Sequence, residues 1–159
     1  YKNDKYADNM LLKVLSAADD LDAFGYIGIY RFLEIYLARG IDISVLGNEI
    51  RKNAAGRFSN FETGYRHFYT FYNKHKKRYL ILDKFFLDQR LNTGIIADGR
   101  NMNDVSGEII RLVSEMSCTR WNIDEIKFKC FQNEDCDFPV YSFLRGLQSE
   151  LTGFLMTIN

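Results

Sequence analysis

The sequence is poor in the residues that interrupt helices and in those that staple small folds. It has one proline, Pro139, and three cysteines among 159 residues. A single proline leaves most of the chain free to form helices. Three thiols cannot make a disulfide framework, because an odd count leaves one unpaired. A chain of this length can bury a core without covalent staples. We therefore expect a single domain over residues 1–159 in a reducing, cytoplasmic compartment.

Net charge and long apolar runs are missing as well. The 21 basic and 21 acidic residues cancel, so the whole chain has no field that would attract nucleic acid or an anionic membrane. We expect neither as a partner. No segment reaches the roughly 18 apolar residues that a membrane span needs; the nearest, Tyr26 to Ala38, carries Arg31 and Glu34. The chain begins with Tyr1 rather than Met, which favours a module cut from a longer protein.

The signature motifs of several enzyme classes are absent. The sequence has no GxGxxG, GxxxxGK[ST], HExxH or GxSxG pattern, which removes the motif-bearing nucleotide-binding, zinc-protease and hydrolase classes. The only two histidines are His67 and His75, and neither has an adjacent carboxylate. A histidine needs such a partner to orient it for acid–base catalysis. We expect a protein without catalysis of its own.

Apolar residues recur at the helical period in the first part of the chain. They predict a first helix from about residue 5 to 22. The segment Tyr26 to Ala38 is apolar on nearly all sides, which is typical of a helix in the middle of a core. Gly40 is a natural stop for that helix. Asp42 or Ser44 can cap a short helix after it.

A second helical stretch is predicted where Ser59 and Glu62 match a capping box. The helix would end in the basic run 74–78, where cations offset the negative end of the helix dipole. It carries one aromatic stripe, formed by Phe61, Tyr65, Phe68, Tyr69 and Tyr72. A stripe at helical spacing is typical of a core, and it is also compatible with a pocket that stacks a planar ligand.

The second half of the chain mixes strand and helix signals. The runs 79–82 and 95–97 predict short strands, and an amphipathic helix follows from about residue 103 to 116. Residues 123–141 alternate apolar and polar side chains on both sides of a Gln-Asn-Glu-Asp turn, which predicts a β-hairpin whose return strand contains Pro139 at a sheet edge. A last helix, 141–156, follows. The fold class is α+β: a helical N-terminal half, then a small, mostly antiparallel sheet with a C-terminal β-hairpin and flanking helices.

The cysteines are the candidate metal ligands. Cys130 and Cys136 face each other across the predicted hairpin, and Cys118 precedes it. Thiolates suit zinc, which takes about four ligands in a tetrahedron. An oxygen ligand could come from Glu125, Glu134 or Asp135. The spacing is not that of a CxxC knuckle, and free cysteines also fill sheet faces as small hydrophobic residues. A zinc site and three buried thiols both remain open.

The segment from Asp104 to Val140 resembles the C-terminal part of the vinyl-reductase-type (4-vinyl reductase) domain of bacterial ligand-sensing regulators. In that family a helix leads into a strand that ends in cysteine, then an acidic turn and a Cys-x-Phe sequence. The matching residues are Cys130, Asp135, Cys136 and Phe138. The resemblance implies a small-molecule sensing or regulatory domain, often dimeric, with an apolar and aromatic pocket and, in some members, zinc.

The leading hypothesis is therefore a sensory domain that binds a small apolar or aromatic ligand and signals through its C-terminal helix. The ligand would contact the aromatic stripe, with His67 beside it. A homodimer or an attached output domain would be the partner.

Two other functions stay open. The chain could be a dimerisation or partner-docking module that uses its last helix. It could also be a metal-dependent phosphoesterase, since Asp19, Asp20 and Asp22 cluster in sequence and carboxylates bind Mg²⁺ or Mn²⁺. Solvated acids at a helix end would give the same pattern. The basic run 74–78 could likewise touch phosphate or RNA, or be a solvated helix end.

Overall fold

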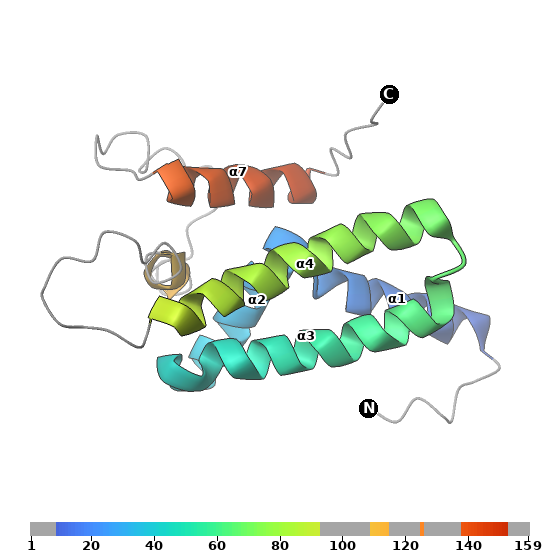
Figure 1. Cartoon of the computed structure of the whole chain (residues 1–159), viewed down its shortest axis with the longest axis horizontal. Helices are drawn as coiled ribbons and strands as arrows, with labels where there is room; N and C mark the ends of the chain where they lie inside the picture. The colour runs from blue at the N-terminus through green and yellow to red at the C-terminus, as the bar shows by residue number, and fades with distance from the viewer. Residues whose placement is uncertain (1–8, 93–108, 115–124, 126–137, 153–159) are drawn as a thin grey trace, which may run out of the picture.

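Five long helices account for most of the described structure. The computed structural model describes residues 9–92, 109–114, 125 and 138–152, with the side chains of 88–92 and 138–139 left aside. The helices are α1 (Met10–Asp22), α2 (Gly25–Ala38), α3 (Ile43–Tyr65), α4 (Tyr69–Asn92) and α7 (Phe138–Leu151), and residues 109–114 are helical too. α3 and α4 form a long antiparallel pair, α2 packs against α4 and α7, and α1 packs against α3 (Figure 1).

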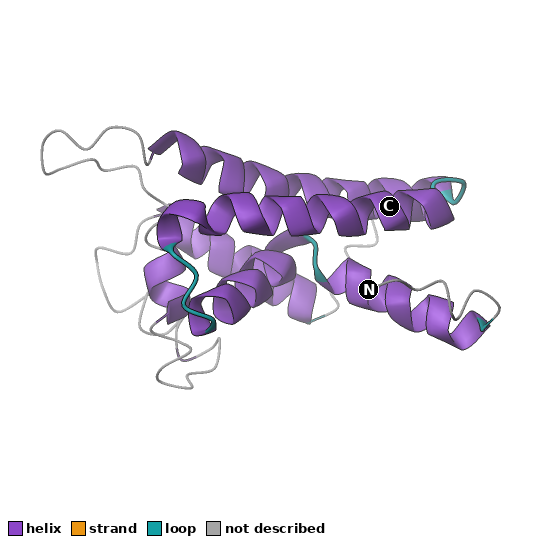
Figure 2. Ribbon diagram, turned by 90° about the horizontal axis from the view of Figure 1, so that it is seen from below, coloured by secondary structure: helices purple, strands orange, loops and turns teal. Residues whose placement is uncertain are grey.

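The structure contradicts the predicted α+β fold. The described part of the chain contains helices and no strand (Figure 2). Residues 79–82, which predict a strand, lie inside α4. Four apolar residues in a row are compatible with a buried strand or with one turn of a buried helix, and here the helix continues through them. The predicted strand 95–97 lies outside the described residues.

The C-terminal β-hairpin is contradicted where the structure describes it. Glu125 is helical. Phe138 and Val140, assigned to the return strand, belong to the first turn of α7. Pro139 is the second residue of that helix, where a missing N–H costs no helical hydrogen bond and the fixed φ suits the helix. The turn of the predicted hairpin lies outside the described residues.

The predicted ends of α1 and α2 and the predicted cap of α3 are confirmed, whereas α1 begins at Met10 and not near residue 5. Asn9 caps α1 by accepting hydrogen bonds from the amides of Leu11 and Leu12 at 3.0 and 3.3 Å. α2 ends at Ala38, and Gly40 adopts a φ of +68°, the left-handed conformation that ends helices. Asp42 then caps α3 by accepting from the amide of Ser44 at 2.7 Å.

α3 is longer than the sequence predicts, and the capping box at Ser59 is wrong. Ser59 and Glu62 lie inside α3, where the Ser59 carbonyl accepts from the Thr63 hydroxyl at 2.9 Å. Gly56, just before them, is tolerated in a helix at a cost of about 1 kcal/mol. The break comes instead at residues 66–68, so the basic run 74–78 lies within α4 rather than at a helix end.

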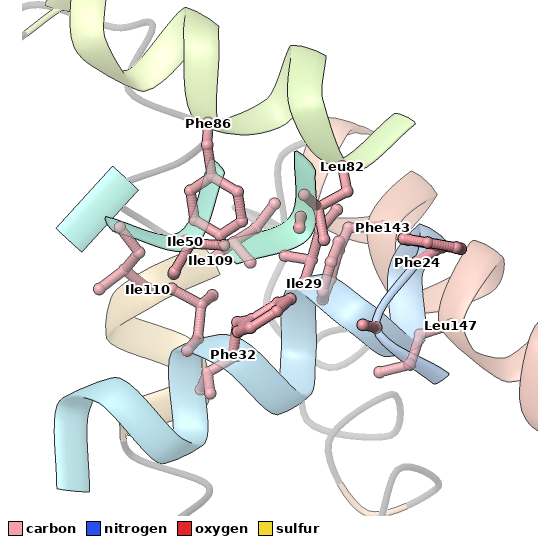
Figure 3. Close-up of a cluster of buried hydrophobic side chains, with 14 of the residues drawn as sticks. Phe24, Ile29, Phe32, Ile50, Leu82, Phe86, Ile109, Ile110, Phe143 and Leu147 are labelled. Atoms are coloured by element: carbon pink, nitrogen blue, oxygen red, sulfur yellow. The ribbon is translucent and has the colours of Figure 1, made fainter. Parts of the chain in front are cut away.

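The core forms where α2, α3, α4, α7 and residues 109–114 meet (Figure 3). The central position predicted for α2 is confirmed, because Ile29, Phe32 and Leu33 are buried at its middle. On α7 the predicted stripe supplies Phe143, Leu144 and Leu147, all buried. Its next member, Leu151, is 52% exposed, so the core ends before the last turn of α7. The apolar residues 154 and 155 of that stripe lie outside the described residues.

Candidate functional site

The aromatic stripe is divided between core and surface. Phe61 is 1% exposed, and its ring stacks on Tyr65 and Tyr72 with centroids 5.3 and 6.4 Å apart. Tyr72 donates its hydroxyl hydrogen to the Glu62 carboxylate at 2.5 Å, which raises the pKa of Tyr72. The rings of Phe61, Tyr65 and Tyr72 thus pack together, with Phe61 against both tyrosines. The inner part of the predicted ligand site is therefore packed core in the described structure.

The other predicted ligand residues point outward from the turn between α3 and α4. Phe68 is 55% and Tyr69 78% exposed, and His67 is exposed with its ring 4.2 Å from that of Phe68. The turn is closed by its own backbone, since the Phe68 N–H donates to the Tyr65 carbonyl and the Tyr72 N–H donates to the Phe68 carbonyl. The break in the helix thus separates two groups of rings that a continuous helix would have aligned.

The sequence pattern did not predict several of the aromatic residues that contact the inner rings. Phe58 stacks on Tyr79 with centroids 4.3 Å apart, and Phe24 meets both rings edge to face. Phe58 lies three residues before Phe61, a helical spacing that would have extended the stripe had α3 been predicted at full length. Tyr79 was assigned to a strand. The aromatic cluster therefore joins the α1–α2 corner, α3 and α4.

Arg78 is the most heavily used polar side chain in this region. It pairs with Glu150 of α7 through two bonds of 3.2 Å, from Nε and from Nη2. Its Nη1 and Nη2 also donate to the backbone carbonyls of Leu21 and Phe24, at 3.1 and 2.8 Å. Arg78 thus ties α4 to α7 and to the α1–α2 corner. A planar guanidinium provides this fork of donors, and lysine would not.

His75 lies next to Arg78, 7% exposed and packed against the rings of Phe61 and Phe71. Its Nδ1 is 3.3 Å from Nη1 of Arg78. Arginine can only donate, so Nδ1 accepts and the imidazole is neutral. Burial, with the charges of Arg78 and Lys74, lowers the pKa of His75 to about 4. The run 74–78 was considered as a solvated helix end, and at His75 the structure shows a buried side chain instead.

The aspartates considered for a metal site contact arginines. Arg57 binds the Asp19 and Asp20 carboxylates at 2.7 and 3.2 Å, and Arg31 binds Asp22 at 2.9 Å. Burial raises the pKa of Asp20, although Arg57 opposes the shift. Beside them is a hollow enclosing about 270 Å³, part of it open solvent. Within the described ranges, no three histidine, cysteine or acidic side chains gather as they would around a metal.

The predicted zinc ligands Cys118, Cys130 and Cys136, with Glu134 and Asp135, lie outside the described residues. Glu125 is described as helical. The ligand geometry of that site stays a prediction. No described helix is long and apolar enough to cross a membrane.

One apolar surface was not anticipated. α1 has apolar residues on one stripe, yet none of its residues, all of them described, is buried. At the same end of the molecule the α3–α4 turn exposes its rings, and Figure 2 shows α1 diverging from α3 toward that end. We call this surface the apolar end; its residues are Met10 (80% exposed), Leu11 (66%), Val14 (54%), Leu15 (55%), Phe68, Tyr69 and Phe71.

The described residues thus define a helical protein with a ring-rich core, an arginine-centred polar node and an exposed apolar end. No protein-family model, curated protein or solved structure matches this chain. Any proposal of function therefore rests on the geometry and the chemistry of the described residues.

Proposed function

We propose that this chain is a non-catalytic association module that docks through the apolar face of α1. One observation carries the proposal: Met10, Leu11, Val14 and Leu15 all remain more than half exposed. A surface helix normally turns such a stripe toward its own core. A contiguous exposed apolar patch marks an interaction surface.

The docking element differs from the one considered in the sequence. A docking module that uses its last helix was one of the alternatives that the sequence left open. In α7 the apolar stripe packs inward, with Phe143, Leu144 and Leu147 each 3% exposed or less. α1 offers the same kind of stripe without a core to cover it. The proposal therefore moves from α7 to α1.

A paired substitution tests the role of α1. In Leu11→Ser/Leu15→Ser the apolar stripe is interrupted at two exposed positions, so the melting temperature should stay within a few degrees of wild type. Retention on phenyl-agarose and any concentration-dependent association in sedimentation velocity should fall. Leu80→Ser on α4, whose side chain is 51% exposed, is the matched control and should change neither.

Two results would count against docking by α1. A double variant that unfolds would show that these leucines hold the fold together. A wild type that is not retained, and that sediments as a monomer at every concentration, would show that the stripe has no affinity for apolar surfaces.

Two earlier hypotheses stay predictions. A ligand-sensing domain requires a planar apolar molecule to raise the melting temperature, which a panel of aromatic compounds checks. A metal-dependent phosphoesterase requires Mn²⁺ binding that Asp20→Asn abolishes. The stacking of Phe61 on its neighbours and the contacts of Arg57 with Asp19 and Asp20 favour packing and charge pairing at these positions.

A further inference from the structure

We infer that the apolar end docks on the surface of an anionic lipid bilayer. The inference rests on the proposed function, because it assigns a partner to the same surface. α1 and the α3–α4 turn would place their apolar side chains at the level of the lipid headgroups. The basic residues beside them would contact lipid phosphates. Interfacial elements of proteins combine these two features.

The first support is the kind of side chain that is exposed. Aromatic rings with a polar edge, such as Tyr69, favour the boundary between headgroups and acyl chains. The aliphatic residues of α1 lie at the same end of the molecule (Figures 1 and 2). Every residue from 66 to 71 is exposed. The turn therefore presents rings on a short, hydrogen-bonded tip that can reach into a headgroup layer.

The second support is charge. Between Glu62 and Asp83 the sequence has no acidic residue and has five basic ones. Four of these, Arg66, Lys74, Lys76 and Lys77, are exposed, in the turn itself or in the first three helical turns of α4. Basic residues near a bilayer surface are attracted by anionic lipids. The net charge of zero, which predicted no membrane partner, conceals this local excess.

The same charges disfavour a second copy as the occupant. A two-fold contact brings identical patches together, so the basic residues around the turn would face their own copies. Like charges that meet across an interface cost binding energy. An anionic surface has the complementary sign. Self-association through the apolar end is therefore the weaker alternative.

A rigid protein or a nucleic acid fits the geometry less well than a fluid bilayer. α1 and the turn are separate elements, and α1 diverges from α3 toward the turn (Figure 2), so a rigid partner would have to fit both elements at once. A stable protein interface needs roughly 800 Å² of well-packed surface on each partner. Single strands bind through stacking and phosphate contacts, to which Leu11 and Val14 contribute nothing. A fluid surface accommodates two separate apolar elements.

Vesicle flotation tests the inference. The whole chain is mixed with vesicles of phosphatidylcholine alone or of phosphatidylcholine with phosphatidylserine, at about 0.1 M salt and at high salt. We expect binding to the anionic vesicles only, weakened by salt. Lys74→Gln/Lys77→Gln should weaken it about thirtyfold, and Phe68→Ser/Tyr69→Ser should abolish it. The control variants Lys52→Gln/Lys84→Gln and Leu80→Ser change exposed residues outside the apolar end and should bind as wild type does.

The outcomes separate the inference from the proposed function. Equal binding to both kinds of vesicle, or self-association without flotation, would overturn the anionic-lipid inference and leave docking by α1 in place. Binding to single-stranded RNA but to neither vesicle would also overturn it. A chain that neither floats, associates nor is retained on phenyl-agarose would overturn both. Circular dichroism of each variant confirms that a lost interaction is not lost folding.

Discussion

At the scale of single residues, Glu150 holds three elements in place. It accepts two hydrogen bonds from Arg78 and a third from the Ile27 amide at 3.1 Å. It also lies against Gly25, where φ is +70° and an added Cβ would overlap the carboxylate. Glycine is therefore required at position 25 both for its backbone conformation and for space. The start of α2 and the end of α7 fit each other through this contact.

We predict that Glu150→Ala lowers the free energy of unfolding by about 3 kcal/mol, because Arg78 would keep a partly buried, unpaired charge. Both side chains of this pair are 18% exposed. Urea denaturation measures the change. Glu49→Ala, at an exposed position of α3, is the control and should change stability by less than about 0.5 kcal/mol. Equal effects of the two substitutions would contradict the role of Glu150.

His75 should make the protein sensitive to acid. Its pKa is about 4 in the folded state and about 6.5 in an unfolded chain. Between these values the unfolded state binds more protons, so stability falls as the pH drops from about 6.5 to 4. The contribution is about 3 kcal/mol, fully present above pH 6.5 and lost below pH 4.

The measurement is urea denaturation from pH 7 to pH 4 for wild type and for His75→Gln. Glutamine can accept the hydrogen bond of Arg78 but does not titrate, so its stability should depend less on pH over this window. His67→Gln alters the exposed histidine and should keep the wild-type slope. The same slope in wild type and His75→Gln would show that His75 is not the acid-sensitive group.

At the scale of elements, two glycines inside helices differ in the space around them: one lies at a close helix contact and the other on an open helix face. A Cβ on Gly28 of α2 would overlap the carbonyl of Ala23 and lie 3.1 Å from Leu82. A Cβ on Gly56 of α3 meets nothing within 4 Å. Both residues lie inside helices, so their intrinsic preferences are alike. Their surroundings differ, because a larger side chain would clash at position 28 and would fit at position 56.

We predict that Gly28→Ala destabilises the protein by about 2 kcal/mol through this clash. Gly56→Ala should stabilise it by about 1 kcal/mol, because alanine favours a helix interior more than glycine does. Thermal denaturation of the two variants under one condition checks both signs. A stabilised Gly28→Ala would mean that α2 does not approach the α1–α2 corner as closely as described.

Sequence patterns predicted these elements unevenly. α1, α2 and the capping residue Asp42 could be found, because their periodicity and stop signals are local. The length of α3 could not, since a capping box at Ser59 is a valid start signal only when the chain before it is not helical. Ile50 and Ala54 pack into the core and keep that segment helical through Gly56.

At the scale of the whole molecule, α1 is the least anchored of the helices that the structure describes. It has no buried residue, whereas α2 is buried at its centre. Two features hold α1 against the rest of the protein: the ion pairs of Arg57 with Asp19 and Asp20, and the α1–α2 corner. Elements with few buried apolar contacts open at a lower free energy than the global unfolding.

Hydrogen exchange should therefore rank the helices. We predict that the amides at the start of α1 exchange faster than those at the centres of α2 and α4, as followed by mass spectrometry of peptides. Anionic vesicles should slow the exchange of α1 if the apolar end docks on them. Equal protection of α1 and α2 without vesicles would contradict the weak anchoring of α1.

The sequence by itself determined the helical front of the chain, the central place of α2 and the apolar stripe of α7. Each depends on a short repeat of apolar residues and on caps a few residues away. Only the tertiary structure decided three further features: the division of the aromatic stripe at residues 66–68, the pairing of Arg78 with Glu150, and the exposure of α1. These depend on contacts between residues far apart in the chain, and an amphipathic pattern is the same whether a core covers it or solvent does.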